Sequence, residues 1–167
     1  MGKIVFNFEK YKMKNTFITF FAFALIFIVS PQANAQCDIP CGIYNDSLRF
    51  VLLIEHIDIM EKAMEEIEQH SAISNPDYNQ IVRWVNAKEA HGDAIQKIVT
   101  SYFLTDRVAI VPATHLYHED YLFKLQLIHE ICLAVNAAKQ STNKTDIVKL
   151  REIVAAFQLA YYVKHEE

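Results

Sequence analysis

Apolar residues recur at alternating steps of three and four along four stretches of the chain after residue 46. This spacing places them on one face of an α-helix, so the pattern predicts four amphipathic helices. We expect them at about 47–69, 77–103, 114–139 and 145–163. The positions expected to face a core are Phe50, Leu53, Ile57, Met60, Met64 and Ile67 in the first stretch, Tyr78, Ile81, Val85, Ile95, Val99 and Tyr102 in the second, Tyr117, Tyr121, Ile128, Ile131, Val135 and Ala138 in the third, and Ile147, Leu150, Val154, Phe157 and Tyr161 in the fourth.

Four such helices joined by short connections predict an all-α fold, an antiparallel four-helix bundle. Asn45, Asp46 or Ser47 is expected to cap the first helix, because a side-chain oxygen there accepts from backbone N–H groups of the first turn. Gly92, inside the second stretch, is expected where a neighbouring helix approaches closely. We find no internal repeat or linker that would suggest a second domain.

Residues 1–35 have the composition of a secretory signal peptide. Lys12-Met13-Lys14 is basic, Phe17 to Val29 is largely apolar, and Ala33-Asn34-Ala35 fits an Ala-x-Ala cleavage site. The apolar run is shorter than the about 20 residues of a transmembrane helix. We therefore expect export to the periplasm or the medium, with a mature chain that begins at Gln36 and no membrane attachment after processing. Met13 is an alternative start.

Processing also changes the charge of the protein. The whole sequence has a formal net charge of −4, and residues 1–35 contain four lysines and one glutamate, so the mature chain is more acidic. An acidic surface argues against nucleic acid as a partner. Residues 36–46 are expected to form a separate hook and residues 47–167 the bundle domain, a length sufficient for one hydrophobic core.

The hook carries the two closely spaced cysteines, Cys37 and Cys41. Pro40 fixes its own φ and Gly42 can adopt φ > 0, so the segment is expected to turn tightly and to bring both thiols to one small centre. The spacing is not that of a zinc ribbon or a thioredoxin motif. A local disulfide in an exported protein remains open on the residues alone. A lipid-modified cysteine is disfavoured, because Gln36 stands where a small residue is required.

Other metal signatures are weak or missing in this sequence. No Glu is followed three residues later by His, which excludes the ferritin-like di-metal pattern, and no Cys-x-x-Cys-His is present for haem. His115 and His118 lie one turn apart and could share a metal or be ordinary surface histidines. Cys132 is expected to be a small buried hydrophobe. Asn143-Lys144-Thr145 matches a glycosylation sequon, but we interpret it as helix-cap chemistry.

Eight consecutive residues, Cys37 to Tyr44, carry a resemblance to a known family. Their sequence, Cys-Asp-Ile-Pro-Cys-Gly-Ile-Tyr, follows the predicted cleavage site by one residue. It resembles the nickel hook of nickel superoxide dismutases, whose mature chains begin His-Cys-Asp-x-Pro-Cys-Gly-x-Tyr. The helical remainder is similar in length to the family's bundle. Gln36 departs from the pattern, because it stands in place of the histidine.

The resemblance implies an enzyme, an antioxidant oxidoreductase that converts superoxide to oxygen and hydrogen peroxide at a nickel ion. Its metal ligands would be the α-amine of Gln36, the thiolate and backbone nitrogen of Cys37, and the thiolate of Cys41. Asp38 and Tyr44 match family positions, and the tyrosine would lie over the open face of the metal. The family also implies a homo-oligomer, a homohexamer. The amine exists only if cleavage follows residue 35, so signal peptide and metal site require the same bond to be cut.

The departure at Gln36 bears on activity, because in the family the first residue's imidazole is also an axial ligand. A carboxamide oxygen is a hard, weak donor and should stabilise trivalent nickel less. His91 and His56 are candidates for a replacement ligand. The alternative is a non-catalytic exported homologue, with a Cys37–Cys41 disulfide or a passively bound metal. Cyclisation of Gln36 to pyroglutamate would remove the amine and favour that alternative.

Overall fold

The computed structural model describes residues 44–163, and within this range the chain forms helices and short connections, with no strand. The all-α prediction is therefore confirmed for this part of the chain. Residues 36–43, which include the predicted metal ligands, lie outside it. The elements are α2 (Asp46–Ala72), α3 (Tyr78–Lys97), the π-helix η1 (Ile98–Arg107), α4 (His118–Gln140) and α5 (Lys144–Tyr162).

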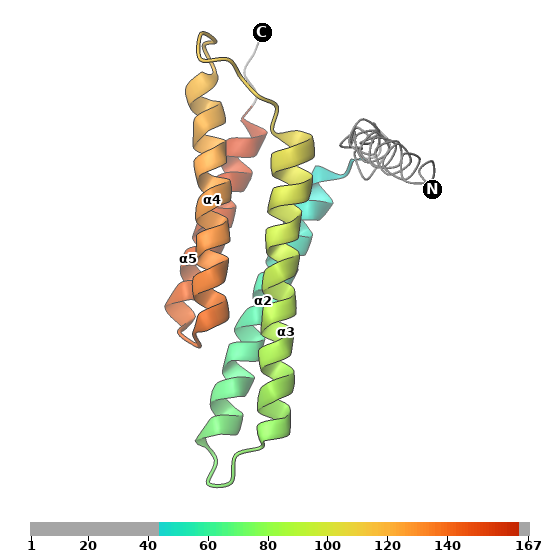
Figure 1. The fold of residues 1–167 in the computed structure, drawn as a ribbon, viewed down its shortest axis with the longest axis vertical. Helices are drawn as coiled ribbons and strands as arrows, with labels where there is room; N and C mark the ends of the chain where they lie inside the picture. Colours follow the sequence, from blue (N-terminus) through green and yellow to red (C-terminus); the bar gives the residue numbers. More distant parts are fainter. Residues whose placement is uncertain (1–43, 164–167) are drawn as a thin grey trace, which may run out of the picture. The chain divides into compact units, whose positions relative to one another are not determined.

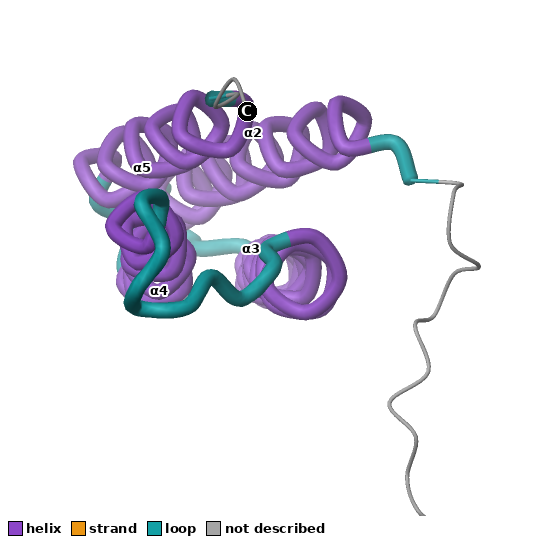
Figure 2. Tube along the Cα trace, turned by 90° about the horizontal axis from the view of Figure 1, so that it is seen from above, coloured by secondary structure: helices purple, strands orange, loops and turns teal. Residues whose placement is uncertain are grey.

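The helices form the predicted antiparallel four-helix bundle (Figure 1). Helix α2 packs against α3 and α5, and α4 packs against the same two helices, so each helix has two neighbours. Figure 2, seen from above, shows the four helices at the corners of the bundle. The start of α2, the end of η1, the start of α4 and the end of α5 therefore meet at one end of the bundle.

Side-chain caps fix where three of the helices begin. The Asn45 side chain accepts a hydrogen bond of 2.9 Å from the backbone N–H of Leu48, so Asn45 is the cap among the three predicted candidates. Asp77 caps α3 in the same way. Asn143 accepts from the backbone N–H of Thr145 at 3.0 Å, which confirms its predicted role as a helix cap. Each of these oxygens satisfies a backbone donor that has no partner within its helix.

Most of the predicted apolar positions form one hydrophobic core. Tyr78 and Val85 were wrongly expected to face it: their side chains are 72% and 37% exposed. Figure 1 shows the reason, because the first turns of α3 extend beyond the α4–α5 hairpin and have only α2 beside them. The fully or nearly fully buried predicted positions are Phe50, Leu53, Ile57, Met60, Met64, Ile67, Ile95, Val99, Tyr102, Ile128, Ile131, Val135, Ala138, Ile147, Leu150, Val154 and Phe157.

Two predicted boundaries are corrected by the structure. The second helix does not stay α-helical to Phe103: it changes at Ile98 into a π-helix that continues to Arg107. The third helix begins at His118 rather than near Thr114, because residues 113–117 form turns after Pro112. The His118 ring is engaged there, with Nδ1 2.8 Å from the carbonyl oxygen of Val111.

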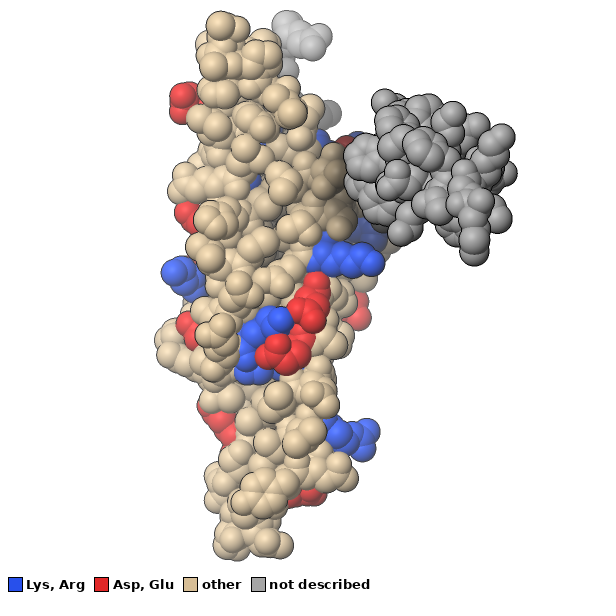
Figure 3. Space-filling view, viewed as in Figure 1, with Lys and Arg blue, Asp and Glu red and all other residues tan. Residues whose placement is uncertain are grey.

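The contact between α3 and α4 depends on two residues of α3. A Cβ atom at Gly92 would lie 2.8 Å from Cγ and Cδ of Lys139, so the close approach predicted for this glycine is confirmed. The Lys139 ammonium pairs with Glu89 and Asp93 of α3, and Figure 3 shows acidic and basic atoms gathered midway along this face. Lys88 is buried, and its ammonium donates to the carbonyl oxygen of Ser141 at 2.6 Å. This places a cation at the carboxyl end of α4, where the helix dipole favours it.

Candidate metal centre

Tyr44, the last residue of the eight-residue motif, is the one residue of the predicted nickel site in the hook that the structure describes. Gln36, Cys37, Asp38 and Cys41 lie outside the described residues. The Tyr44 ring is half-buried and meets the Tyr102 ring edge-on, with centroids 5.6 Å apart. The Arg107 guanidinium carbon lies 4.7 Å from the centroid of the same ring, a distance at which a cation is attracted to the ring face. Tyr44 therefore has a defined position at the start of α2.

The carboxylate of Asp46, two residues later, joins three elements of the bundle. It accepts hydrogen bonds from the hydroxyl groups of Tyr102 at 2.6 Å and Tyr161 at 2.7 Å. The Arg107 guanidinium donates to both carboxylate oxygens, at 2.9 Å from Nε and 2.8 Å from Nη2. Such a bidentate pair is both stronger and more directional than a single contact. We call Tyr44, Asp46, Tyr102, Arg107 and Tyr161 the anchor cluster.

The π-helix explains how two residues of one element reach the same carboxylate. Tyr102 and Arg107 are five residues apart, and in an α-helix, at 3.6 residues per turn, they would point to different sides. A π-helix forms hydrogen bonds from i to i+5, so such residues lie nearly one above the other. The backbone N–H of Val108 accordingly donates to the carbonyl oxygen of Phe103 at 2.8 Å. The π geometry thus aims both side chains at Asp46.

These contacts fix the protonation states of the anchor cluster. Burial alone would raise the pKa of Asp46, but hydrogen bonds from Arg107, Tyr102 and Tyr161 outweigh it and lower the pKa to about 2. Burial, together with the hydrogen bond to Asp46, raises the pKa of Tyr102 to about 12, and the same causes raise the pKa of Tyr161. At neutral pH the aspartate is therefore charged and both phenols keep their protons.

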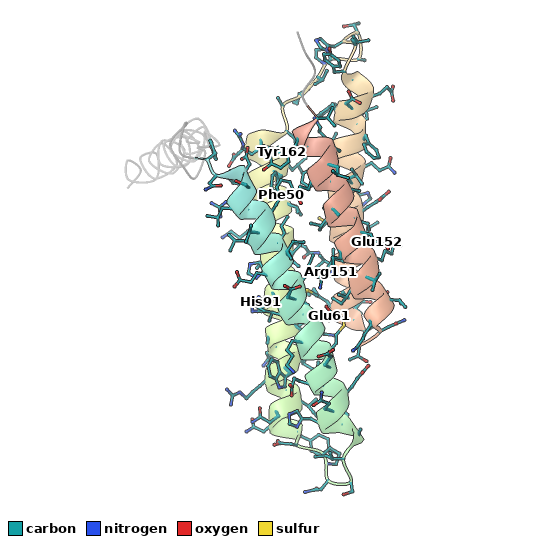
Figure 4. All side chains as sticks on the ribbon, turned by 180° about the vertical axis from the view of Figure 1, so that it is seen from behind. Phe50, Glu61, His91, Arg151, Glu152 and Tyr162 are labelled. Atoms are coloured by element: carbon teal, nitrogen blue, oxygen red, sulfur yellow. The ribbon has the colours of Figure 1, made fainter. Side chains whose placement is uncertain are left out.

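A pocket of about 530 Å³ lies beside the anchor cluster. Asp46, Arg107 and Tyr161 form part of its wall, together with Tyr162, the connection between η1 and α4 and the first turns of α4. Figure 4 shows Phe50 and Tyr162 near this end of the bundle; their ring centroids are 5.6 Å apart. Phe50 is buried in the core, whereas Tyr162 also lines the cavity.

His56 and His91, the two predicted candidates for a replacement ligand, lie next to each other. Their Nδ1 atoms are 2.8 Å apart, across the contact between α2 and α3. Asp46 and His56 are ten residues apart in one helix, which corresponds to about 15 Å along its axis. Within residues 44–163 no group of three or more His, Cys, Asp or Glu side chains could hold a metal ion.

Comparison with protein families identifies the chain. The family profile described as nickel-containing superoxide dismutase matches residues 31–165. The chain belongs to the nickel-containing superoxide dismutase family. Comparison with curated proteins and with solved structures finds no match.

The donors that the resemblance assigns to residues 36–41 would fit the metal that gives nickel-containing superoxide dismutase its name. The matched range includes Cys37 to Tyr44, and two thiolates with nitrogen donors are ligands that nickel accepts in square-planar geometry. In the described part, the Tyr44 side chain is held by the edge-on contact with the Tyr102 ring and by the Arg107 guanidinium over its own ring. No helix in residues 44–163 is long and apolar enough to cross a membrane.

Apart from Tyr44, the residues of the anchor cluster are the part of the candidate site that the sequence analysis missed. Asp46 was considered only as a helix cap, and Tyr102 and Tyr161 only as residues of the core face. Arg107 lies in a stretch that was expected to be a connection. The available signal was the presence of an aspartate, an arginine and a tyrosine at three predicted helix ends that meet in an antiparallel bundle. That signal indicates that these residues lie near one another. It does not indicate that Tyr102 and Arg107 both bind the Asp46 carboxylate, because that depends on the π-helix.

Proposed function

We propose that this protein is an exported nickel-dependent superoxide dismutase. The observation that carries the proposal is the family match over residues 31–165, which contains the hook sequence Cys37 to Tyr44. The reaction converts two superoxide ions and two protons into one molecule of oxygen and one of hydrogen peroxide. When bound, the nickel ion supplies the one-electron Ni(II)/Ni(III) couple that this exchange requires.

The proposed ligands come from the first residues of the mature chain. The α-amine of Gln36, the thiolate and backbone nitrogen of Cys37 and the thiolate of Cys41 would hold the ion. Thiolates are strongly electron-donating ligands and so stabilise the higher oxidation state of nickel, which is the reason for assigning them this role. Asp38 belongs to the same matched motif.

The anchor cluster supports this proposal from the side of the bundle. Tyr44 follows Cys41 by three residues, so the contacts that hold its ring restrict where the hook leaves the bundle. Asp46 holds Arg107 against Tyr44 and Tyr102 beside it, and ordering these side chains before metal binding reduces the entropy that binding would otherwise cost. Tyr102, whose pKa is raised to about 12, keeps its proton at neutral pH, and its hydroxyl group donates a hydrogen bond to Asp46.

Gln36 favours a second candidate function, a non-catalytic homologue. In this reading Cys37 and Cys41 form a disulfide or hold a metal that does not turn over. The mass of the exported protein shows whether residue 36 keeps the free amine that the proposed ligand set requires. A start at Gln36 supports the proposed ligand set, whereas a loss of one ammonia from that mass indicates pyroglutamate and removes the amine ligand.

The proposal is tested by removing each thiol in turn. We expect Cys37→Ser and Cys41→Ser to abolish nickel binding and superoxide consumption while circular dichroism retains the helix content, because the hook precedes the bundle core. Cys132→Ser is the matched control: its side chain is half-buried in α4, and the variant should keep both nickel and activity. If Cys41→Ser loses the helix content, the cysteines are structural and the proposal fails.

Export and assembly are further parts of the proposal. The signal-peptide composition of residues 1–35 supports release into the periplasm or the medium, and the family resemblance supports a homohexamer. Light scattering of the nickel-loaded protein measures the number of subunits. A monomer or dimer at working concentration contradicts the hexamer without affecting the proposed reaction.

A further inference from the structure

His56 and His91 form an isolated imidazole pair between two helices. Their Nδ1 atoms are 2.8 Å apart, and their ring centroids are 5.0 Å apart with the ring planes at 52°. Both residues are half-buried, and Figure 4 shows His91 midway along the bundle. One turn away on α2, Leu53 and Met60 are fully buried apolar residues. Two nitrogen donors thus converge from α2 and α3 at the edge of an apolar region.

The hydrogen bond between the rings requires at least one neutral imidazole. One Nδ1 donates its proton and the other accepts with a lone pair. Burial, and the charge of His91, lower the pKa of His56, while Glu55 acts in the opposite direction. The neutral form that this arrangement favours is also the form in which histidine binds metal ions.

We propose that His56 and His91 form a metal site separate from the hook, which binds a divalent late transition-metal ion, Cu²⁺ most tightly. Imidazole nitrogens lie at about 2.0–2.1 Å from such ions, so two of them at a right angle are about 2.9 Å apart, against about 3.3 Å in a tetrahedron. The observed 2.8 Å already brings the two nitrogens to such a separation, while the 5.0 Å between the ring centroids shows that the rings point at each other, so each ring must turn for both lone pairs to meet one ion. Copper leads nickel and zinc in the usual affinity order for nitrogen sites.

Binding through both Nδ1 atoms requires each ring to turn away from the line between the two nitrogens, and one ring to change its tautomer. The ring that donates in the hydrogen bond moves its proton to Nε2, a change of tautomer that releases no proton. Water completes the coordination, since both side chains remain partly exposed. Among the other histidines of the described part, Nδ1 of His115 accepts from the backbone N–H of Tyr117, and Nδ1 of His118 lies against the carbonyl oxygen of Val111. Those two rings are therefore already engaged.

The experiment uses the full chain with the hook thiols replaced, Cys37→Ser/Cys41→Ser, so that the result does not depend on the proposed nickel chemistry. Cu²⁺ is titrated at neutral pH in a non-coordinating buffer and followed by calorimetry and electron paramagnetic resonance. We expect one copper ion per chain whose spectrum carries hyperfine splitting from imidazole nitrogens. Adding His91→Gln or His56→Gln should remove this equivalent.

His129→Gln is the matched control, because His129 is an exposed histidine of α4 outside the pair. It should leave the copper equivalent in place, and circular dichroism should show equal helix content in all variants. If His91→Gln binds as much copper as its parent with the same spectrum, or if the parent binds none with imidazole splitting, the site does not exist. Failure of the Cys37 and Cys41 variants to lose nickel would instead contradict the proposed dismutase.

Discussion

At the scale of single residues, the anchor cluster shows how one carboxylate organises the end of the bundle. Asp46 receives four hydrogen bonds from three side chains, two of them from the Arg107 guanidinium. Its side chain is 19% exposed, so these bonds form partly shielded from water. Hydrogen bonds to a charged group are stronger than neutral ones, and removal of one partner leaves the others unsatisfied. The fixed start of α2 therefore depends on the charge of Asp46.

The low pKa of Asp46 predicts how stability depends on pH. The folded protein keeps this carboxylate charged down to about pH 2, whereas its ordinary pKa is 3.8, so its contribution is present above about pH 4 and is lost as pH falls toward 2. We expect Asp46→Asn to lower the free energy of unfolding at pH 7 by about 1–2 kcal/mol, since partial exposure weakens the pair.

The difference between Asp46→Asn and the parent should shrink below pH 4 and vanish near pH 2, as measured by urea unfolding at several pH values. Asp58→Asn is the control, because Asp58 pairs with Arg151 but its side chain is 59% exposed, and such pairs contribute little. The same arginine also pairs with Glu61 of α2, and Figure 4 shows these two side chains beside each other. A difference that stays constant from pH 7 to pH 2 would contradict the assignment of the charge to Asp46.

At the scale of elements, the helices were predictable because burial and periodicity agree. Leu53, Ile131 and Phe157 each belong to a series of apolar residues spaced by three and four, and their side chains are fully buried. The change from α to π at Ile98 was not predictable, because it alters hydrogen bonding without interrupting the apolar pattern through Val99 and Tyr102. The exposure of Tyr78 was missed for a different reason: periodicity defines a face but does not show which neighbour covers it.

The contact between α3 and α4 gives a prediction for Gly92. A leucine there must displace the Lys139 stem at 2.8 Å and press on Val135 at 3.3 Å, so we expect Gly92→Leu to destabilise the protein by about 1–3 kcal/mol despite its better helix propensity. Ala90→Leu, at an exposed position two residues earlier in the same helix, should change stability by no more than about 0.5 kcal/mol. Thermal or urea unfolding measures both. Equal stability of the two variants would mean that the helices can move apart without cost.

At the scale of the whole molecule, the chain has two parts, the helical bundle and the predicted hook, and Tyr44 stands where they join. The bundle follows from a repeated physical pattern, and the family assignment rests on a profile match over residues 31–165. The anchor cluster beside Tyr44 was not predicted from the sequence, because it forms only where the ends of η1 and α5 meet the start of α2. Likewise, His56 and His91 were singled out separately, and only the packing of α2 on α3 shows that they are a pair.

The contact between His56 and His91 bears on the role of Gln36, because these two histidines are the candidates to replace the missing imidazole. If nickel lacks an axial imidazole, restoring the family's residue with Gln36→His should raise superoxide consumption by about 10-fold or more, the scale on which groups around a metal affect activity. We expect this increase because the Nδ1 atoms of His56 and His91 already contact each other. Pulse radiolysis on protein with equal nickel content measures it, and intact mass confirms that each N-terminus carries a free amine.

The matched variant is His91→Ala in the parent chain. It should leave activity nearly unchanged if His91 does not serve nickel, whereas a large loss, together with no gain from Gln36→His, would show that the pair supplies the axial ligand. A protein that binds nickel but stays inactive after Gln36→His would instead support the non-catalytic alternative. In that case the loss of one imidazole does not by itself explain the inactivity. Other parts of the site would also be unable to support the reaction.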